Sequence, residues 1–164
     1  MGNIKAKTHL EKLGFADSDK KKNDHDKIQT WVYENIETIL EETVMKNNKH
    51  NWEITKNVWE HQVVYTNMTY KMVIGFIDIM AELKGIFHYD PELKHQNYDI
   101  KPIFIEIKTE IPSLGELIRQ MRAYQTYQGL YTAYLIVSPD DRHKKILNEQ
   151  GFYFYKYKDP SLLF

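Results

Sequence analysis

Cysteine is absent from this chain of 164 residues, so disulfide bridges, thiolate metal sites and cysteine nucleophiles are excluded. No apolar run is long enough to cross a bilayer, and we therefore expect no contact with a membrane. The first residues, Met1 to Ala6, carry no apolar core of the kind found in secretory signals. These absences predict a protein of the reducing cytoplasm.

Net charge is also nearly absent, because 22 Lys and Arg residues are balanced by 23 Asp and Glu residues. The chain is therefore not a polycation, and binding of nucleic acid would need a local basic face or the help of metal ions. A hydrophobic fraction of 42% with 27% charged residues is typical of a folded protein rather than a disordered one. The length predicts a single domain that spans residues 1–164.

The N-terminal segment 1–23 is predicted to be irregular. It ends in the charged run Asp19 to Asn23, which favours a solvated loop over a phosphate contact. A helix is expected to begin at Asp24, its cap, because apolar residues then recur at intervals of three and four positions. His25 lies near the start of this helix, on the side of the apolar stripe.

Strands are predicted next, over residues 52–65 and 70–83, because both segments are rich in Val, Ile, Trp and Tyr. The four residues between them, 66–69, form the expected turn. A long irregular insertion, residues 84–101, separates this hairpin from a third strand over residues 103–109.

The second half of the chain alternates between helices and strands. A capping box, Ser113 to Glu116, predicts a helix that runs to about residue 127 and stops before Gly129. Residues 132–138 are almost continuously apolar, which predicts a strand buried on both faces. A short helix from residue 139 to residue 151 and a last strand over residues 152–157 follow. A crossover of this length implies a parallel pair in a mixed sheet covered by helices, which is an α/β fold.

Charged residues interrupt two of the predicted strands. Alternation within the segment Ile103 to Lys108 places three isoleucines on one face and Phe104, Glu106 and Lys108 on the other. By the same rule, Asp78 shares its face with apolar neighbours, where an unpaired carboxylate would be costly. Glu106 and Lys108 alone could pair with each other or face water on an edge strand. Together with Asp78, they predict an oxygen-ligand site for Mg²⁺ or Mn²⁺.

The order of these residues resembles the PD-(D/E)XK nuclease superfamily, whose hallmark is an acidic residue on one strand and Glu-X-Lys on the next. Here Asp78 is followed by Glu106, Ile107 and Lys108. The downstream Gln120-Met-Arg-Ala-Tyr124 is similar to the Gln-X-X-X-Tyr motif of the RecB-like and lambda-exonuclease-like branch. The resemblance covers roughly residues 24–138, and the chain departs from the family in having no proline before Asp78 and in its long 84–101 insertion.

This resemblance implies a restriction-endonuclease-like core, helix, three strands, helix and strand, to which this chain adds a C-terminal helix and strand. It implies a metal-dependent deoxyribonuclease that hydrolyses phosphodiester bonds. Asp78 and Glu106 would ligate Mg²⁺ or Mn²⁺, with the Ile107 carbonyl as a further ligand. Lys108 would orient or deprotonate the attacking water, or stabilise the transition state.

Further site residues follow from the resemblance on the two helices. Gln120 and Tyr124 would position Lys108 or a DNA phosphate, the alternative being a partly exposed glutamine and a core tyrosine. Arg119 and Arg122 flank them and would contact the DNA backbone, unless they are merely solvated.

A functional histidine or acidic residue is found on the first helix of such nucleases. His25 is the candidate here, with Asp26 and Glu34 as rivals.

Two other groups of residues are expected to have ordinary roles. A flexible lobe that touches substrate is favoured over a second metal site for the residues His88, Asp90 and His95. Simple packing is favoured over a base-stacking platform for the alternating residues Tyr153, Tyr155 and Tyr157.

The expected partner is DNA, although RNA, and exonuclease or endonuclease action, remain open. The small size favours structure- or end-directed cleavage over recognition of a sequence. Cutting both strands needs two sites, which favours a homodimer or a module of a larger assembly. The alternative is a non-catalytic domain that binds nucleic acid or protein and retains the nuclease fold.

Overall fold

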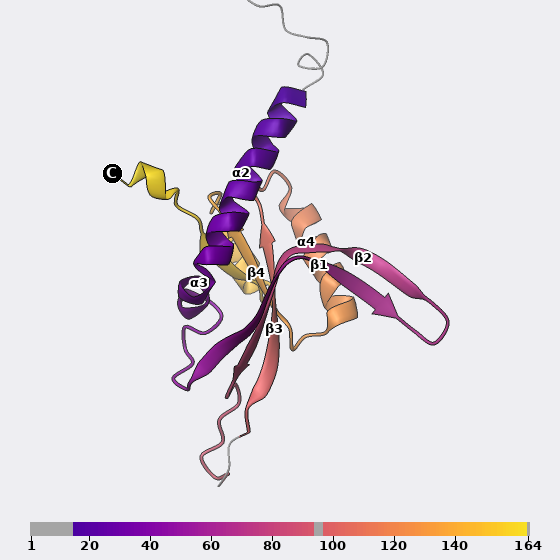
Figure 1. Ribbon diagram of the computed structural model, residues 1–164, viewed down its shortest axis with the longest axis vertical. Coiled ribbons are helices and arrows are strands. Elements are labelled where there is room, and N and C mark those ends of the chain that lie inside the picture. The colour runs from indigo at the N-terminus through magenta and orange to yellow at the C-terminus, as the bar shows by residue number, and fades with distance from the viewer. Residues whose placement is uncertain (1–14, 94–96, 164) are drawn as a thin grey trace, which may run out of the picture.

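The computed structural model describes residues 15–93 and 97–163, with the backbone alone for residues 15–19. Helices and strands alternate along the second half of the chain, as Figure 1 shows. In chain order the elements are α2 (Phe15–Glu34), α3 (Ile36–Glu42), β1 (Trp52–Thr66), β2 (Lys71–Gly85), β3 (Asp99–Ile107), α4 (Leu114–Gln128), β4 (Ala133–Ser138), α5 (Lys144–Glu149), β5 (Tyr153–Lys156) and the 3₁₀ turn η1 (Pro160–Leu162).

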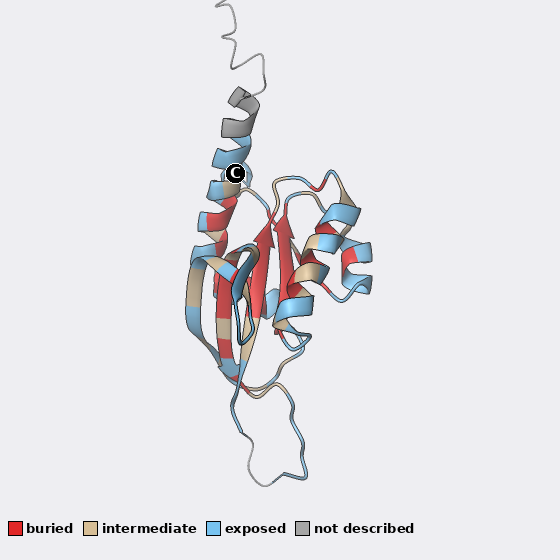
Figure 2. Cartoon of the chain, turned by 90° about the vertical axis from the view of Figure 1, so that its right-hand side faces the viewer, coloured by how far each residue is buried: buried red, intermediate tan, exposed pale blue. Residues whose placement is uncertain are grey.

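The five strands form one mixed sheet in the order β1-β2-β3-β4-β5. β2 is antiparallel to both of its neighbours, β1 and β3, whereas β3, β4 and β5 run parallel to one another. The prediction of an α/β fold with a parallel pair inside a mixed sheet is therefore confirmed. All six residues of β4 are buried, as predicted for a strand covered on both faces (Figure 2).

Two hydrophobic clusters lie on the two faces of the sheet. The first joins α2 and α3 to the sheet and contains the three alternating isoleucines of β3, Ile103, Ile105 and Ile107. The second joins α4 and α5 to the opposite face and contains Phe104 of β3. Adjacent residues of β3 thus serve different clusters, which confirms the predicted alternation and places Glu106 on the α4 side.

The predicted irregular segment 1–23 is wrong for residues 15–23, which belong to α2, while residues 1–14 lie outside the described part. Asp24 is consequently an interior residue of α2 and not its cap. Residues 17–24 of this helix are all polar, so they have no apolar period that could reveal it. Lysines followed four residues later by aspartates, such as Lys20 and Asp24, still support a helix.

The insertion between the second and third strands is shorter than predicted. β2 continues to Gly85 and β3 already begins at Asp99, so the connection is limited to residues 86–98. Its residue His95 lies outside the described residues.

Pro102 lies inside β3, opposite Glu82 of β2, although a proline lacks the N–H that a strand interior needs. The backbone N–H of Lys108 is directed to β4, where it bonds the Val137 carbonyl at 3.0 Å. Alternation places the nitrogen of Pro102 on the same side, but the pairing with β4 starts only at Ile103. No ladder bond is therefore lost at Pro102.

The ends of the later elements were predicted with mixed success. Ser113 caps α4 by accepting a bond from the Glu116 N–H at 3.3 Å, and Gly129 ends the helix with a φ of 85°, as expected. The short helix predicted from residue 139 begins only at Lys144. The Asp140 carboxylate instead accepts a bond from the Arg142 N–H at 3.3 Å, which forms a turn, and another from the Ile111 N–H at 2.9 Å.

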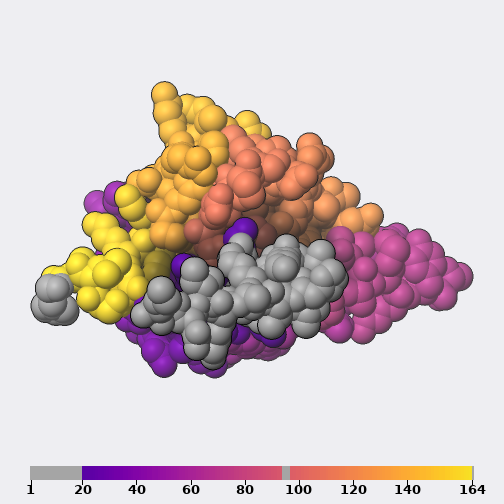
Figure 3. Space-filling view, turned by 90° about the horizontal axis from the view of Figure 1, so that it is seen from above, coloured from indigo at the N-terminus to yellow at the C-terminus, as the bar shows by residue number. Residues whose placement is uncertain are grey.

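The outer half of the β1–β2 hairpin, residues 61–77, is named the arm here. Pairing between β2 and β3 ends at Ile79 and Ile105, so the arm has no third strand beside it. Figures 1 and 3 show it extending beyond the rest of the molecule. Among the described residues, no helix is both long and apolar enough to span a membrane.

Candidate active site

The site is built where β2 leaves β3. The pairing of β2 with β3 covers Ile79 to Gly85. Asp78 is the residue just before it in the chain, on the side of the arm. On β1, Glu60 lies between the partners of Ile77 and Ile79 and has a φ of 50°, which marks a local irregularity. Ile77 packs in the second cluster and Ile79 in the first, as expected when the strand turns at this point.

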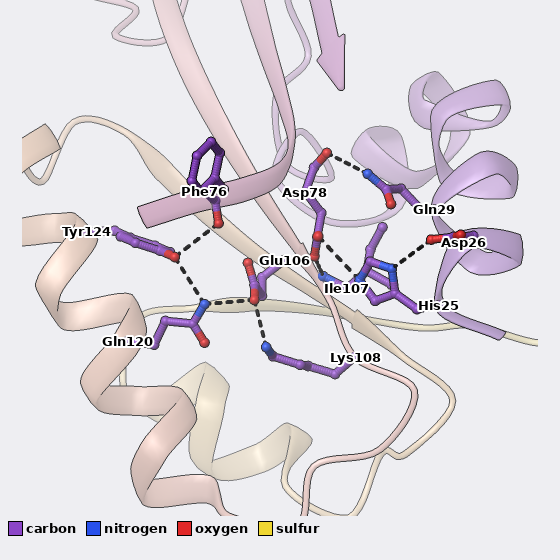
Figure 4. A network of polar contacts seen from close by, with 10 residues as sticks. All are labelled: His25, Asp26, Gln29, Phe76, Asp78, Glu106, Ile107, Lys108, Gln120 and Tyr124. Carbon is purple, nitrogen blue, oxygen red and sulfur yellow. Dashed lines mark hydrogen bonds and ion pairs between the residues drawn. The ribbon is translucent and has the colours of Figure 1, made fainter. Parts of the chain in front are cut away.

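The side chain of Asp78 replaces the backbone partner that β3 loses beyond Ile105. Its Oδ2 accepts a hydrogen bond of 2.7 Å from the N–H of Ile107, the next backbone donor on the β2 side of β3. N–H and C=O of one strand residue point to the same side, so the Ile107 carbonyl also faces Asp78. The second oxygen, Oδ1, lies 3.3 Å from Nε2 of His25 on α2 (Figure 4).

Glu106 is the most deeply buried charged group of the site, with 4% of its surface exposed. Its Oε1 lies 2.7 Å from Nζ of Lys108 and accepts a bond of 2.8 Å from Nε2 of Gln120. Its Oε2 is buried and has no hydrogen-bond partner. Burial, and next the negative charge of Asp78, raise the pKa of Glu106, whereas Lys108 and Gln120 oppose this shift.

A chain of hydrogen bonds ties α4 to the start of the arm. Gln120 Nε2 also donates to the Tyr124 hydroxyl at 3.1 Å, and this hydroxyl donates to the Phe76 carbonyl at 3.1 Å (Figure 4). Burial is the main cause that raises the pKa of Tyr124. Gly75 provides the space, because a Cβ on it would lie 2.9 Å from the Tyr124 hydroxyl oxygen. Phe76 itself is 57% exposed, so it does not share the core position that alternation suggested.

His25 is the first-helix residue that reaches the site. The hydrogen bond to Asp78 is the main cause that raises its pKa, partly offset by burial. Asp26 contacts His25 Nδ1 at 3.6 Å rather than Asp78. Glu34 is exposed at the C-terminal end of α2, two and a half turns beyond His25. Of the three candidates, the geometry selects His25.

Gln29 belongs to the site although the sequence did not point to it. Its side chain is 1% exposed, and its Nε2 donates to the Asp78 backbone carbonyl at 2.9 Å. The available signal was its spacing, four residues after His25 and therefore on the same helix face. Gln29 and His25 together hold the main chain and the side chain of Asp78 against α2.

The two arginines of α4 differ in their surroundings. Arg122 bonds Gln125 at 2.6 Å and the Gln150 carbonyl at 2.8 Å, and it stacks on the Phe152 ring at 4.7 Å. It therefore links α4 to the end of α5, while Arg122 itself remains exposed. Arg119 is exposed.

The other groups that the sequence singled out lie away from the site. Tyr155 and Tyr157 pack against the Trp31 ring at centroid distances of 6.1 and 5.2 Å, which confirms ordinary packing for them, while Tyr153 is 37% exposed. His88 lies 6.3 Å from the ring of Tyr131, and the Asp90 carboxylate bonds the N–H of Glu92. Within the described residues, His88 and Asp90 do not belong to a group of three His, Cys, Asp or Glu side chains.

The oxygen donors at the site fit a hard divalent cation that keeps part of its water shell. Within residues 15–93 and 97–163, no three His, Cys, Asp or Glu side chains are grouped to hold a metal. The protein would supply two carboxylates, Asp78 and Glu106, and the Ile107 carbonyl. Mg²⁺ accepts such a set, because it usually keeps several of its waters. The buried, unpartnered Oε2 of Glu106 is the acceptor that a cation would satisfy.

Comparison of the chain with protein-family models, with curated proteins and with solved structures gives no match. Inference about function therefore depends on the geometry of the site.

Proposed function

We propose that the protein is a metal-dependent nuclease that hydrolyses DNA phosphodiester bonds. The observation that carries this proposal is the meeting of Asp78, Glu106 and Lys108 where β2 leaves β3, with one Glu106 oxygen lacking a partner. A purely structural ion pair would not require a second carboxylate beside it, because that charge opposes ionisation of Glu106.

The proposal includes the restriction-endonuclease-like identity of the core. Its support is the order of elements from α2 to β4, with the acidic residue, Glu-X-Lys and Gln-X-X-X-Tyr on the elements where that superfamily carries them. The hydrogen bond from Gln120 to Glu106 gives the last motif a physical link to the first two.

Asp78, Glu106 and the Ile107 carbonyl would hold the Mg²⁺ or Mn²⁺. When bound, this ion neutralises phosphate charge and lowers the pKa of water, which makes a hydroxide nucleophile accessible near neutral pH. Gln120 keeps the Glu106 carboxylate in one orientation, and His25 and Gln29 do the same for Asp78.

Lys108 carries the positive charge that faces the scissile phosphate. Its Nζ lies 2.7 Å from Oε1 of Glu106, so this carboxylate already occupies one side of the ammonium group. This favours orienting the attacking water and stabilising negative charge at phosphorus over removing a proton from the water. Arg119, exposed on α4, is the arginine that would contact the DNA backbone.

The test is a cleavage assay on supercoiled plasmid and on labelled single-stranded, duplex and branched DNA, with Mg²⁺, Mn²⁺ or EDTA. Lys108→Met removes the charge, and Asp78→Asn removes a ligand while keeping an oxygen for the Ile107 N–H. Each should lower the cleavage rate by at least about 100-fold, whereas the control Lys84→Met, away from the site, should cleave like the wild type. RNA substrates in the same assay identify the preferred nucleic acid.

The second candidate is a non-catalytic binding domain on the same fold. It is favoured by the finding that only two carboxylates, and no group of three ligand side chains, meet within the described residues. Folded wild-type protein that binds DNA but leaves every substrate intact with either metal would establish this candidate and overturn the nuclease.

A further inference from the structure

A hollow of about 380 Å³ lies at the opposite end of β3 from the candidate active site. It is lined by the connection between α3 and β1, by the segment that follows β2, and by Lys101 of β3. Lys101 is six residues before Ile107, a distance of about 20 Å along a strand. The hollow thus belongs to a different part of the molecule, and its volume is in the range of small-molecule sites.

Lys101 brings a half-buried positive charge to this hollow without a partner of opposite charge. Its Nζ lies 5.8 Å from the ring centre of Phe87 and 5.3 Å from that of Tyr131. No ion pair or hydrogen bond of its ammonium group is present among residues 15–93 and 97–163. Burial lowers the pKa of Lys101. The aromatic rings offset part of the charge, but they leave its N–H donors without acceptor oxygens.

Asp99, two residues before Lys101 on β3, does not neutralise it. The Asp99 carboxylate accepts a bond of 2.7 Å from the Tyr131 hydroxyl and another of 2.8 Å from the Ile100 N–H. The Asp99 carboxylate therefore has other partners and forms no ion pair with Lys101.

The remaining lining combines basic groups with flat rings. Lys49 and His50 add to the basic character, and no acidic residue lines the hollow. The His50 ring stacks on the Tyr89 ring at 4.4 Å with an interplanar angle of 25°. Asn48 fixes this wall, because its side chain donates to the Ile86 carbonyl at 3.0 Å and accepts from the His50 N–H at 2.8 Å.

We propose that this hollow binds a phosphate group attached to a planar base, either as a free nucleotide or as one nucleotide of a nucleic-acid strand. The phosphate supplies the acceptor oxygens and the negative charge that Lys101 lacks. The stacked rings of His50 and Tyr89 provide a face for the base. This site does not depend on the proposed nuclease activity, so either proposal can fail without the other.

Titration calorimetry in EDTA, which prevents metal-dependent cleavage, tests the proposal with four probes: adenosine monophosphate, adenosine, inorganic phosphate and a 12-nucleotide single strand. We expect the monophosphate or the strand to bind, and the Kd for it to increase at least about tenfold in Lys101→Met. Lys84→Met is the matched control, because Lys84 also lies over a tyrosine ring, that of Tyr98 at 5.7 Å, but does not line the hollow. Its Kd should stay within about twofold.

A second measurement does not require a variant. Acetylation of the wild-type lysines is followed by peptide mass spectrometry with and without the bound probe, and the probe should slow modification of Lys101 but not of Lys84. The tighter of the monophosphate and the strand identifies the natural source. The proposal is overturned if neither binds, or if binding leaves both the Lys101→Met affinity and the labelling of Lys101 unchanged.

Discussion

The two halves of β2 differ in almost every physical respect. The inner half, Ile79–Gly85, pairs with β1 and β3, and five of its seven residues are buried. The outer half, residues 71–77, pairs with β1 alone and exposes large apolar side chains, including 57% of Phe76 and 41% of Met72. Asp78 is the residue between the halves.

This difference shows how a polar site can exist beside a hydrophobic sheet. Where β2 leaves β3, the Ile107 backbone loses a strand neighbour, and a carboxylate takes over the hydrogen bond. Glu106, one residue earlier on β3, points to the α4 side and is bonded there by Gln120. At the edge of the paired region, charged side chains thus find hydrogen-bond partners, and Asp78 and Lys108 remain partly exposed.

The largest difference between the halves should be seen in stability. Leu83→Ala in the inner half removes a fully buried side chain, and we expect it to lower the free energy of unfolding by about 3 kcal/mol. Leu93→Ala, at a 58% exposed loop position, is the control and should change it by less than about 0.5 kcal/mol. Urea denaturation measures both, and equal effects would contradict the contrast.

A smaller effect is expected at Gly75, where the outer half contacts α4. The new Cβ of Gly75→Ala would displace Tyr124 and with it Gln120, at an expected loss of about 2 kcal/mol. In Gly115→Ala the Cβ meets only Arg119 at 3.5 Å, so this control in α4 should be neutral or stabilising. If thermal unfolding gives the same shift for both variants, Tyr124 does not depend on the space at Gly75.

The boundary itself should respond to pH. Because the pKa of Glu106 is raised above 4.5 in the folded state, the native protein holds this proton more firmly than the unfolded chain does. Wild-type stability should therefore decline, relative to Glu106→Gln, as pH rises from about 4.5 through the folded pKa. Between the unfolded and folded pKa values, the decline should be about 1.4 kcal/mol for each increase of one in pH. Urea denaturation at several pH values in EDTA measures the difference, with Glu110→Gln as an exposed control that should run parallel to the wild type.

The smallest effect is expected for Met72→Ala in the outer half. Its side chain is 41% exposed, so truncation should change the free energy of unfolding by less than about 0.5 kcal/mol. Denaturation at two protein concentrations, together with sedimentation, extends the test to the predicted homodimer. A loss above about 1 kcal/mol that grows with protein concentration would mean that a second copy covers the arm.

Local patterns in the sequence were sufficient for most of the fold. Alternation in β3 placed Glu106 and Phe104 on one face, and the Ser113 cap and Gly129 gave the limits of α4. The first half of α2 escaped prediction because a uniformly polar helix has no apolar period. The contact of Asp140 with Ile111 was not predicted, because it joins two loops that are far apart in the chain.

For the site, the sequence predicted five residues that lie in one region of the structure: Asp78, Glu106, Lys108, Gln120 and Tyr124. The sequence could not predict that β2 changes direction at Asp78. This change depends on the pairing of β2 with both β1 and β3. For Gln29 the only signal was its spacing of four residues from His25, which was too weak because a glutamine in a helix is usually exposed. The contacts of Arg122 with Gln150 and Phe152 could not be predicted, because these partners come from a later part of the chain.

The fit of the Tyr124 hydroxyl over Gly75 has a consequence for how this sequence can diverge. The two positions are 49 residues apart along the chain, yet an added methyl at one would occupy the space of the hydroxyl at the other. Related chains should therefore carry a bulkier residue in place of Gly75 only where a shorter one replaces Tyr124. Such paired replacement, rather than invariance of either position alone, would be the evolutionary trace of this contact.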